Sequence, residues 1–169
     1  NDDDLYKKYN EIDISDADEE SIEFHKDLGI DFKNAGHGLS NESRSRLVEI
    51  DKKLIELGIS FSENIAKDQT ELKFSEVELN GLSKNELNNL KKDGENFIIT
   101  MAYPDVNAVS ENCNVRSTRE IVWKAFNNRA VEDNIPILKE AVLLRNEKSK
   151  LFGFETWAEY RLQNRMAKN

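Results

Sequence analysis

Two histidines and one cysteine are the residues of this sequence that could bind a transition metal or act as a nucleophile. His25 begins the stretch "HKDLG" and His37 begins "HGLSN". Neither stretch has the glutamate and second histidine of an H-E-x-x-H zinc helix, in which two imidazoles bind the metal and the glutamate activates a water molecule. Cys113 has no flanking base that would favour the reactive thiolate, so we interpret it as inert. These residues predict neither a zinc site nor a nucleophile within the chain.

The other residues that could carry chemistry do not form a recognisable catalytic set. No glycine-rich phosphate loop occurs, and the carboxylates fall mostly on polar helix faces, where no general acid–base pair can be nominated. The aromatic residues recur at helical spacing, which is more typical of a core than of a ligand platform: Phe61, Trp123, Phe126, Phe154, Trp157 and Tyr160. We therefore assign no catalytic, cofactor-binding or metal-binding residue to this chain.

The composition limits the class of protein and its partners. The chain has 169 residues, enough for one domain or for part of a larger one, and 38% of them are hydrophobic and 34% charged. A net charge of −9 argues against nucleic acid or an anionic membrane surface as the main partner. No apolar run is long enough to span a membrane. The single cysteine excludes an internal disulfide framework and fits a reducing compartment.

The charge is distributed unevenly along the chain. Residues 1–23 contain ten acidic residues against two lysines, whereas residues 139–168 contain seven basic and four acidic residues. We interpret both stretches as solvated surface. The alternatives are that the basic stretch pairs with the acidic one or attracts acidic ligands.

The spacing of apolar residues predicts a mainly α-helical chain of long packed antiparallel helices. A first helix is expected over residues 17–34, ended by Gly36 and Gly38, and Ser40 is expected to cap the next one. That second helix, of about 25 residues, has a continuous apolar stripe. The stripe consists of Leu47, Ile50, Leu54, Leu57, Phe61 and Ile65, with Leu54 fully buried, and it is widened by Val48, Ile55 and Ile59, which predicts packing on more than one side.

A small β element is expected near residues 70–103. The runs "TELKF" and "NFIITMAYP" are rich in β-favouring residues, and Pro104 stops the second run. Between them, "SEVE" and "SKNE" have the capping-box pattern of short helices, and "KDGEN" is expected to be a turn. These patterns predict two short helices between an antiparallel pair of strands.

Three further helices are expected after residue 117. The first covers residues 118–129, with Ile121, Val122, Ala125 and Phe126 on one face. Asn134 is expected to cap the second, with Pro136 in its first turn and Gly153 after its end. The inner face of this second helix is predicted to consist of Ile137, Leu138, Ala141, Leu144 and Leu151.

The last helix is expected to begin with a capping box of Thr156 and Glu159 and to run to Asn169. Tyr160, Leu162 and Met166 would then cover more than half of its circumference, so they could not all face one neighbour. This arrangement predicts an exposed apolar patch and self-association through the C-terminal helix.

Several separated blocks of this sequence resemble the thimet oligopeptidase family, the zinc metallopeptidases that include neurolysin and the fungal saccharolysin. The family has a run beginning T-R and ending R-M-A-K, which is matched here from Thr118 and Arg119 through Ala125, Phe126, Arg129 and Tyr160 to residues 165–168. Upstream, "FSEVELNGLS" resembles the block F-x-x-x-E-L-x-G-L-P, and Cys113, Val115, Thr118 and Arg119 fit C-x-V-x-x-T-R. Asn114, Arg116 and Arg161 depart from the family's pattern.

The resemblance covers about residues 22–169 and implies a role in a larger enzyme. In the family, the zinc ligands and the glutamate that acts as general base lie far downstream of this region, so no catalytic residue carries over to this chain. We therefore expect an N-terminal fragment cut at both ends, with residues 1–20 an acidic segment that we do not place and residues 21–169 a helical wall of the substrate channel. The parent enzyme is expected to bind zinc, to cleave short peptides in the cytoplasm, with the mitochondrial intermembrane space as the alternative location, and to supply the remainder of its chain as a partner.

Two other interpretations stay open at this point. The chain could be a helical binding or scaffold module without peptidase activity. It could also belong to a neighbouring branch of the same superfamily, such as the mitochondrial intermediate peptidases or the bacterial-type dipeptidyl carboxypeptidases. The block C-x-V-x-x-T-R and the ending R-M-A-K favour the thimet branch.

Overall fold

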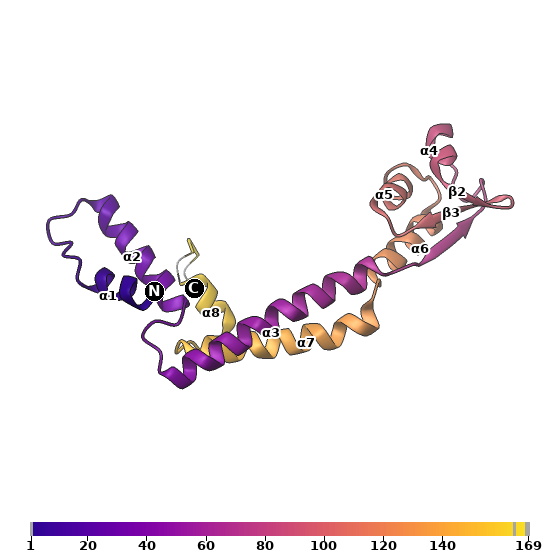
Figure 1. Cartoon of the computed structure of the whole chain (residues 1–169). Coiled ribbons are helices and arrows are strands. Elements are labelled where there is room, and N and C mark those ends of the chain that lie inside the picture. Colours follow the sequence, from indigo (N-terminus) through magenta and orange to yellow (C-terminus); the bar gives the residue numbers. More distant parts are fainter. Residues whose placement is uncertain (1, 164, 168–169) are drawn as a thin grey trace. The chain divides into compact units, whose positions relative to one another are not determined.

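The structure is a computed structural model that describes residues 2–163 and 165–167. Within this part of the chain there are eight helices and one three-stranded sheet, which confirms the predicted mainly α-helical class with a small β element (Figure 1). The chain divides into two compact units. The first unit comprises residues 1–58 and 138–169, and the second comprises residues 59–137.

In the first unit, helices α1 (Asp2–Asn10) and α2 (Glu19–Asn34) are joined by an aromatic cluster. The Tyr9 ring stacks on His25 at 4.2 Å between centroids, and its hydroxyl donates to the His25 carbonyl oxygen over 3.0 Å. Tyr6 stacks on His37 at 4.7 Å and also contacts buried Phe32. This cluster orders residues near the N-terminus that the sequence patterns left unplaced.

The longest helices, α3 (Asn41–Ala66) and α7 (Val131–Leu151), run antiparallel and side by side (Figure 1). In the first unit they are linked by ion pairs of Arg46 with Glu147 at 2.7 Å and of Lys53 with Glu140 at 3.6 Å. Arg46 precedes Lys53 in α3, whereas its partner Glu147 follows Glu140 in α7, as expected for antiparallel helices. Ser40 caps α3 as predicted, because its hydroxyl accepts the Ser43 N–H over 3.2 Å.

The apolar stripe of α3 is narrower than its sequence indicates. Leu47, Ile50 and Leu57 are buried, but Leu54 is only half-buried, so the prediction that it is fully buried is wrong. The predicted second packed side is also wrong, since Val48, Ile55 and Ile59 are exposed. One neighbouring helix covers only the i, i+3, i+4, i+7 face, and residues about 100° around the helix from that face remain outside the contact. Leu138 on α7, which was predicted to lie on the inner face of that helix, is likewise exposed.

The last helix, α8 (Trp157–Leu162), is shorter than expected. Its capping box of Thr156 and Glu159 is confirmed, but residues 163, 166 and 167 are in turns and residue 165 is in a bend. Residues 164, 168 and 169 lie outside the described part. The ending has a local cause, because the Gln163 side chain donates to the Tyr160 carbonyl oxygen and the Arg165 N–H to that of Leu162. Tyr160 is buried against the rings of Phe152, Phe154 and Trp157.

The sheet of the second unit has three strands instead of the predicted two. Strands β1 (Glu71–Phe74), β2 (Lys91–Asp93) and β3 (Asn96–Thr100) are antiparallel, with β3 in the centre. The "KDGEN" stretch forms the β2–β3 hairpin around Gly94, whose φ is +62°. The register pairs Phe74 with Phe97 and Leu72 with Ile99, so these apolar side chains share the inner face.

The predicted helix at "SEVE" is replaced by turns. The Glu78 carboxylate accepts the N–H and hydroxyl of Ser75 at 2.8 and 2.7 Å, but the chain turns here, and Leu79 enters the core fully buried. The second capping box, Ser83 with Glu86, does begin a helix, α4 (Lys84–Asn89).

Helices α5 (Tyr103–Asn112) and α6 (Arg116–Asn127) complete the second unit together with the adjoining parts of α3 and α7. The patterns did not predict α5, because Pro104 stands in its first turn and was interpreted as the end of a strand. Asn134 is not a cap, because it lies inside α7, with its amide donating to the Phe61 carbonyl oxygen over 3.1 Å and accepting from Asn64 over 2.9 Å. This pair of bonds explains why a polar residue is buried at that position.

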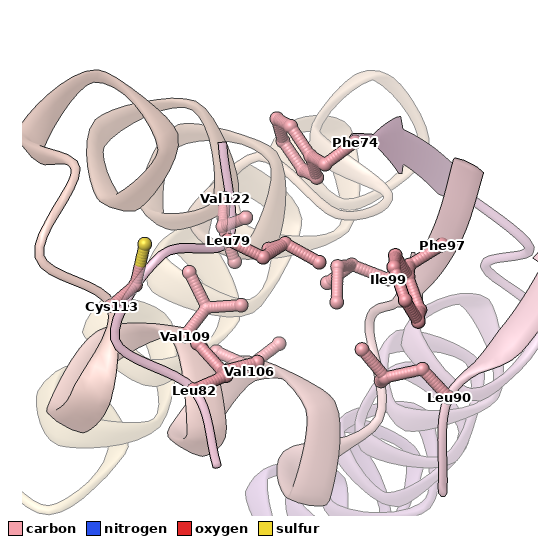
Figure 2. Packing of buried hydrophobic residues seen from close by; sticks show 10 residues of the cluster. All are labelled: Phe74, Leu79, Leu82, Leu90, Phe97, Ile99, Val106, Val109, Cys113 and Val122. Atoms are coloured by element: carbon pink, nitrogen blue, oxygen red, sulfur yellow. The ribbon is translucent and has the colours of Figure 1, made fainter. Parts of the chain in front are cut away.

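The core of the second unit lies between the inner face of the sheet and helices α5 and α6 (Figure 2). Ile99, Leu79, Val109 and Val122 are fully buried there. Ile121, predicted to share the inner face of α6, is exposed, as is Trp123. The core therefore uses about one residue per turn of α6, because α6 contacts it along a narrow line.

Candidate functional site

The histidines and the cysteine lie in different surroundings and do not form a common site. His25 and His37 belong to the aromatic cluster of the first unit, where His37 Nδ1 is 3.3 Å from the Asp3 carboxylate. Cys113 is buried in the core of the second unit. Among the residues that the structure describes, no three His, Cys, Asp or Glu side chains are grouped to hold a metal ion, so the side chains present do not fit a zinc site. Within the same residues, no helix is both long and apolar enough to cross a membrane.

The carboxylates with shifted pKa values hold structural positions. The pKa of Glu78 is lowered by its hydrogen bonds with Ser75, and that of Glu86 chiefly by the Ser83 hydroxyl. The pKa of Glu147 is lowered by the hydrogen bond with Arg46. A general acid needs the opposite shift, which keeps a carboxyl group protonated near neutral pH. Glu78 therefore stabilises a turn, Glu86 a helix cap and Glu147 an ion pair.

Two sequence blocks that are far apart along the chain meet in the second unit. The carbonyl oxygen of Glu78 accepts the Thr118 hydroxyl over 2.8 Å and the Cys113 thiol over 3.4 Å. The Asn114 N–H donates to the Asn80 carbonyl oxygen over 2.7 Å. We call this contact between residues 78–82 and 112–119 the loop junction. It explains the "ELNGL" and C-x-V-x-x-T-R patterns as two halves of one structural contact.

Gly81 is required at the centre of the loop junction. Its φ is +112°, and a Cβ atom built there would lie 2.2 Å from the Asn112 carbonyl oxygen and 2.8 Å from the Asn114 nitrogen. Both of these are backbone atoms, which cannot swing aside as a flexible side chain can. On the other side, the Arg119 guanidinium donates to the Cys113 carbonyl oxygen. The loop junction thus fixes the position of α5 relative to the segment that follows β1.

A cleft of about 870 Å³ lies elsewhere in the second unit, beside the outer face of the sheet. Its walls come from the last turns of α3, the starts of β1 and β2, the end of β3, the first residues of α5 and the turn between α6 and α7. The residues that line it include Asp68, Glu71, Lys91, Met101, Tyr103 and Arg129. A concave surface with a few fixed polar groups is the usual form of a ligand site.

Arg129 is the best fixed polar group of this cleft. Its guanidinium lies 3.7 Å from the centroid of the Phe126 ring, and its Nε donates to the Phe126 carbonyl oxygen over 2.9 Å. Tyr103 contacts Phe126 edge to face at 5.5 Å, so both groups flank the same ring. Arg129 matches the family pattern, but no role could be assigned to it from the sequence. Only the three-dimensional convergence of α3, the sheet and α5 shows that it lines a cleft.

The sequence comparisons agree on one family. The pattern that defines Peptidase family M3 matches residues 109–169. The chain is 36% identical to the Thimet-like oligopeptidase of Dictyostelium discoideum over 98% of its own length, and 32% identical to Oligopeptidase A of Salmonella typhimurium over 82%. It is also 28% identical over 82% of its length to Saccharolysin of Saccharomyces cerevisiae.

The same alignments show how much of these relatives the chain represents. It spans 25% of the Dictyostelium protein, 23% of the Salmonella protein and 20% of the yeast protein. The pattern match includes Thr118, Arg119 and Arg129, and the aligned region includes the loop junction. By sequence, this chain belongs to Peptidase family M3.

Proposed function

We propose that this chain is a non-catalytic wall region of the substrate channel of a zinc-dependent cytosolic oligopeptidase that cleaves short peptides. The observation that carries the proposal is the 36% identity to a thimet-like oligopeptidase over 98% of the chain. In this proposal the zinc ligands and the general base belong to sequence outside the aligned quarter of the relatives. The described residues contribute structure and access, since they do not fit a metal site.

Selection of substrates by size requires a rigid channel wall, because a wall that deforms would also admit large proteins. The loop junction supports such a role, because a fully buried leucine, two hydrogen bonds to the Glu78 carbonyl oxygen and a close backbone approach at Gly81 hold it together. Close packing of this kind transmits force with little deformation. A narrow rigid channel would admit an extended peptide and exclude a folded domain.

A chimera tests the proposal directly. The aligned region of the Dictyostelium Thimet-like oligopeptidase is replaced by this chain, and cleavage of an internally quenched short peptide is measured beside the unmodified relative and a version lacking the region. We expect the chimera to retain cleavage of the short peptide and to leave a folded protein intact. The chain alone should cleave neither.

The controls separate a wall role from simple rescue of folding. A chimera carrying Gly81→Ala should lose both stability and activity, whereas Gly94→Ala, at an open turn, should lose less stability and retain activity. A correctly folded chimera without any peptidase activity would contradict the proposal and favour a binding or scaffold module. Turnover by the isolated chain would contradict it as well.

A further inference from the structure

The guanidinium of Arg129 has hydrogen-bonding capacity that its neighbours do not use. Its Nε donates to the Phe126 carbonyl oxygen, and Nη1 is 3.4 Å from that of Met101. A guanidinium has five N–H donors, so three remain after these two contacts with described residues. Among the ion pairs of the described part of the chain, none involves Arg129.

The position of this guanidinium is fixed by one aromatic ring and two carbonyl oxygens. Phe126 supports one face of its plane at 3.7 Å, and the two carbonyl oxygens lie beside Nε and Nη1. The next residue, Ala130, has a φ of +51°, which is costly for a residue with a Cβ atom. The Asn134 N–H holds that conformation by donating to the Ala130 carbonyl oxygen over 2.9 Å. A pre-oriented fork loses less entropy when it binds a planar anion.

The rest of the cleft favours a ligand with both an apolar body and a charged end. Ile65, Met101 and Pro104 provide apolar lining, and Tyr103, which is 66% exposed, provides a flat aromatic wall beside Phe126. Lys91 adds a second cation.

Two carboxylates, Asp68 and Glu71, also line the cleft. Asp68 accepts the Thr70 N–H over 3.0 Å. The pKa of Lys73 is raised chiefly by its ion pair with Asp93 and to a smaller extent by Glu71. Four charged side chains thus line the cleft, two cationic (Lys91 and Arg129) and two anionic (Asp68 and Glu71). This mixture suits a ligand that is polar along its length and has one anionic group.

We propose that this cleft binds a carboxylate group of a short peptide, with Arg129 as the anchor and Tyr103 as the wall for the adjoining side chain. Planar bidentate recognition is the interaction for which an oriented guanidinium is suited. The carboxylate follows from the geometry alone, whereas the choice of a peptide as its carrier rests on the proposed function. The carboxylate can come from the C-terminus of the peptide or from an acidic side chain, and the test distinguishes them.

The test uses the ¹⁵N-labelled 169-residue chain and three tetrapeptides. These are N-acetyl-tetra-alanine with a free C-terminus, the same peptide with a C-terminal amide, and an amidated N-acetyl tetrapeptide with one glutamate among alanines. Each is titrated while backbone amides and the arginine Nε–H signals are followed by NMR. We expect the free acid to bind about tenfold more tightly than the plain amide, which is the ratio given by one charge-assisted pair. The shifts should include the Arg129 Nε–H and residues 100–103.

The variants separate the anchor from the wall. Arg129→Lys retains the charge but loses the fork, so the preference for the acid should disappear. Arg116→Lys, at an exposed arginine of the same unit outside the cleft, should retain it. Tyr103→Ala should weaken the acid and the amide alike. Circular dichroism of each variant confirms that it is folded, and the comparison of acid with amide on the unmodified chain needs no variant at all.

Each outcome decides a specific point. Tighter binding of the free acid than of both amides assigns the site to the peptide C-terminus, and tight binding of the glutamate peptide assigns it to an acidic side chain. Equal affinity for all three peptides, or shifts that lie outside the cleft, would overturn the proposal. Because the chain is tested alone, a failed chimera with intact acid preference refutes only the proposed function, and an active chimera without acid preference refutes only this inference.

Discussion

Gly81→Ala gives the sharpest test of the loop junction. The substitution adds one Cβ atom at a residue with a φ of +112°, and that atom would be 2.2 Å from the Asn112 carbonyl oxygen. The backbone conformation alone costs about 1–3 kcal/mol for a residue with a side chain. Relief of the clash requires movement of the segment between α5 and α6, whose Cys113 is part of the core. We expect a total cost of about 3–5 kcal/mol, at the upper end for a single substitution.

Gly94→Ala is the matched control, because it makes the same chemical change without the clash. Gly94 also has a positive φ, +62°, but a Cβ atom there would meet no atom within 4 Å. Only the cost of the left-handed conformation applies, about 1–2 kcal/mol. The contrast between the two variants therefore isolates the effect of the loop junction from that of the backbone conformation.

Hydrogen exchange measures both costs within the correct unit. The amide of Ile99, a fully buried residue in the central strand β3, should exchange only on opening of the second unit, so its protection reports the stability of that unit. We expect Gly81→Ala to lower the free energy of this opening by about 2–3 kcal/mol more than Gly94→Ala does. Equal losses in the two variants would refute the argument that the backbone of residues 112–114 excludes a side chain at this position.

Three further outcomes are expected. Ile50→Ala, at a residue 1% exposed, should cost about 2–4 kcal/mol in urea unfolding, whereas Ile55→Ala, 64% exposed on the same helix, should cost less than about 0.5 kcal/mol. Equal effects would contradict the one-sided packing of α3. Gly58→Ala should raise stability by about 0.5–1 kcal/mol, because a Cβ atom inside this helix would have no neighbour within 4 Å; a loss in thermal unfolding would show a hidden contact. The pKa of Asp3 is lowered, first by its hydrogen bond with Arg44, so the stability that it contributes is present above about pH 4 and is lost as the pH falls through its folded value. Asp3→Asn should reduce the difference between urea midpoints at pH 6 and pH 3, and an unchanged difference would contradict this role.

Local signals predicted those elements whose cause is local. Helix α3 was predicted from the 3.6-residue period of Leu47, Ile50 and Leu57, and its start from the hydroxyl of Ser40. Both signals act within one helix. The boxes of Ser83 with Glu86 and Thr156 with Glu159 likewise gave the starts of α4 and α8.

The same signals failed where packing decides. The Glu78 carboxylate accepts the Ser75 N–H, which is one of the two bonds of a capping box, but the Ser75 hydroxyl donates to the same carboxylate. The chain turns here because Leu79 enters the core and Gly81 fits against the backbone of residues 112–114. Asn134 has the residue type of a cap but is used inside α7 to bond α3. Neither outcome depends on nearby residues, so no local pattern could predict it.

The candidate site was beyond local patterns for a related reason. The cleft gathers residues from position 62 to position 129, and none of them stands in a recognised motif for ligand binding. The resemblance to a family drew attention to Arg129, but its free donors follow from where Phe126 and Met101 present their carbonyl oxygens. This information exists only in the folded unit.

The two bonds of Asn134 have a consequence for the order in which the chain folds. The second unit is one continuous stretch of residues, while the first is made of two stretches that flank it. During synthesis, all residues of the second unit are therefore made before the C-terminal stretch of the first unit. Asn64 and Asn134, 70 residues apart, are bonded within the second unit, so its folding closes a loop whose entropy would otherwise cost roughly 4 kcal/mol. Once that loop is closed, the contact between Arg46 and Glu147 closes only a short additional loop. The remaining contacts between α3 and α7 are then local and can form one after another.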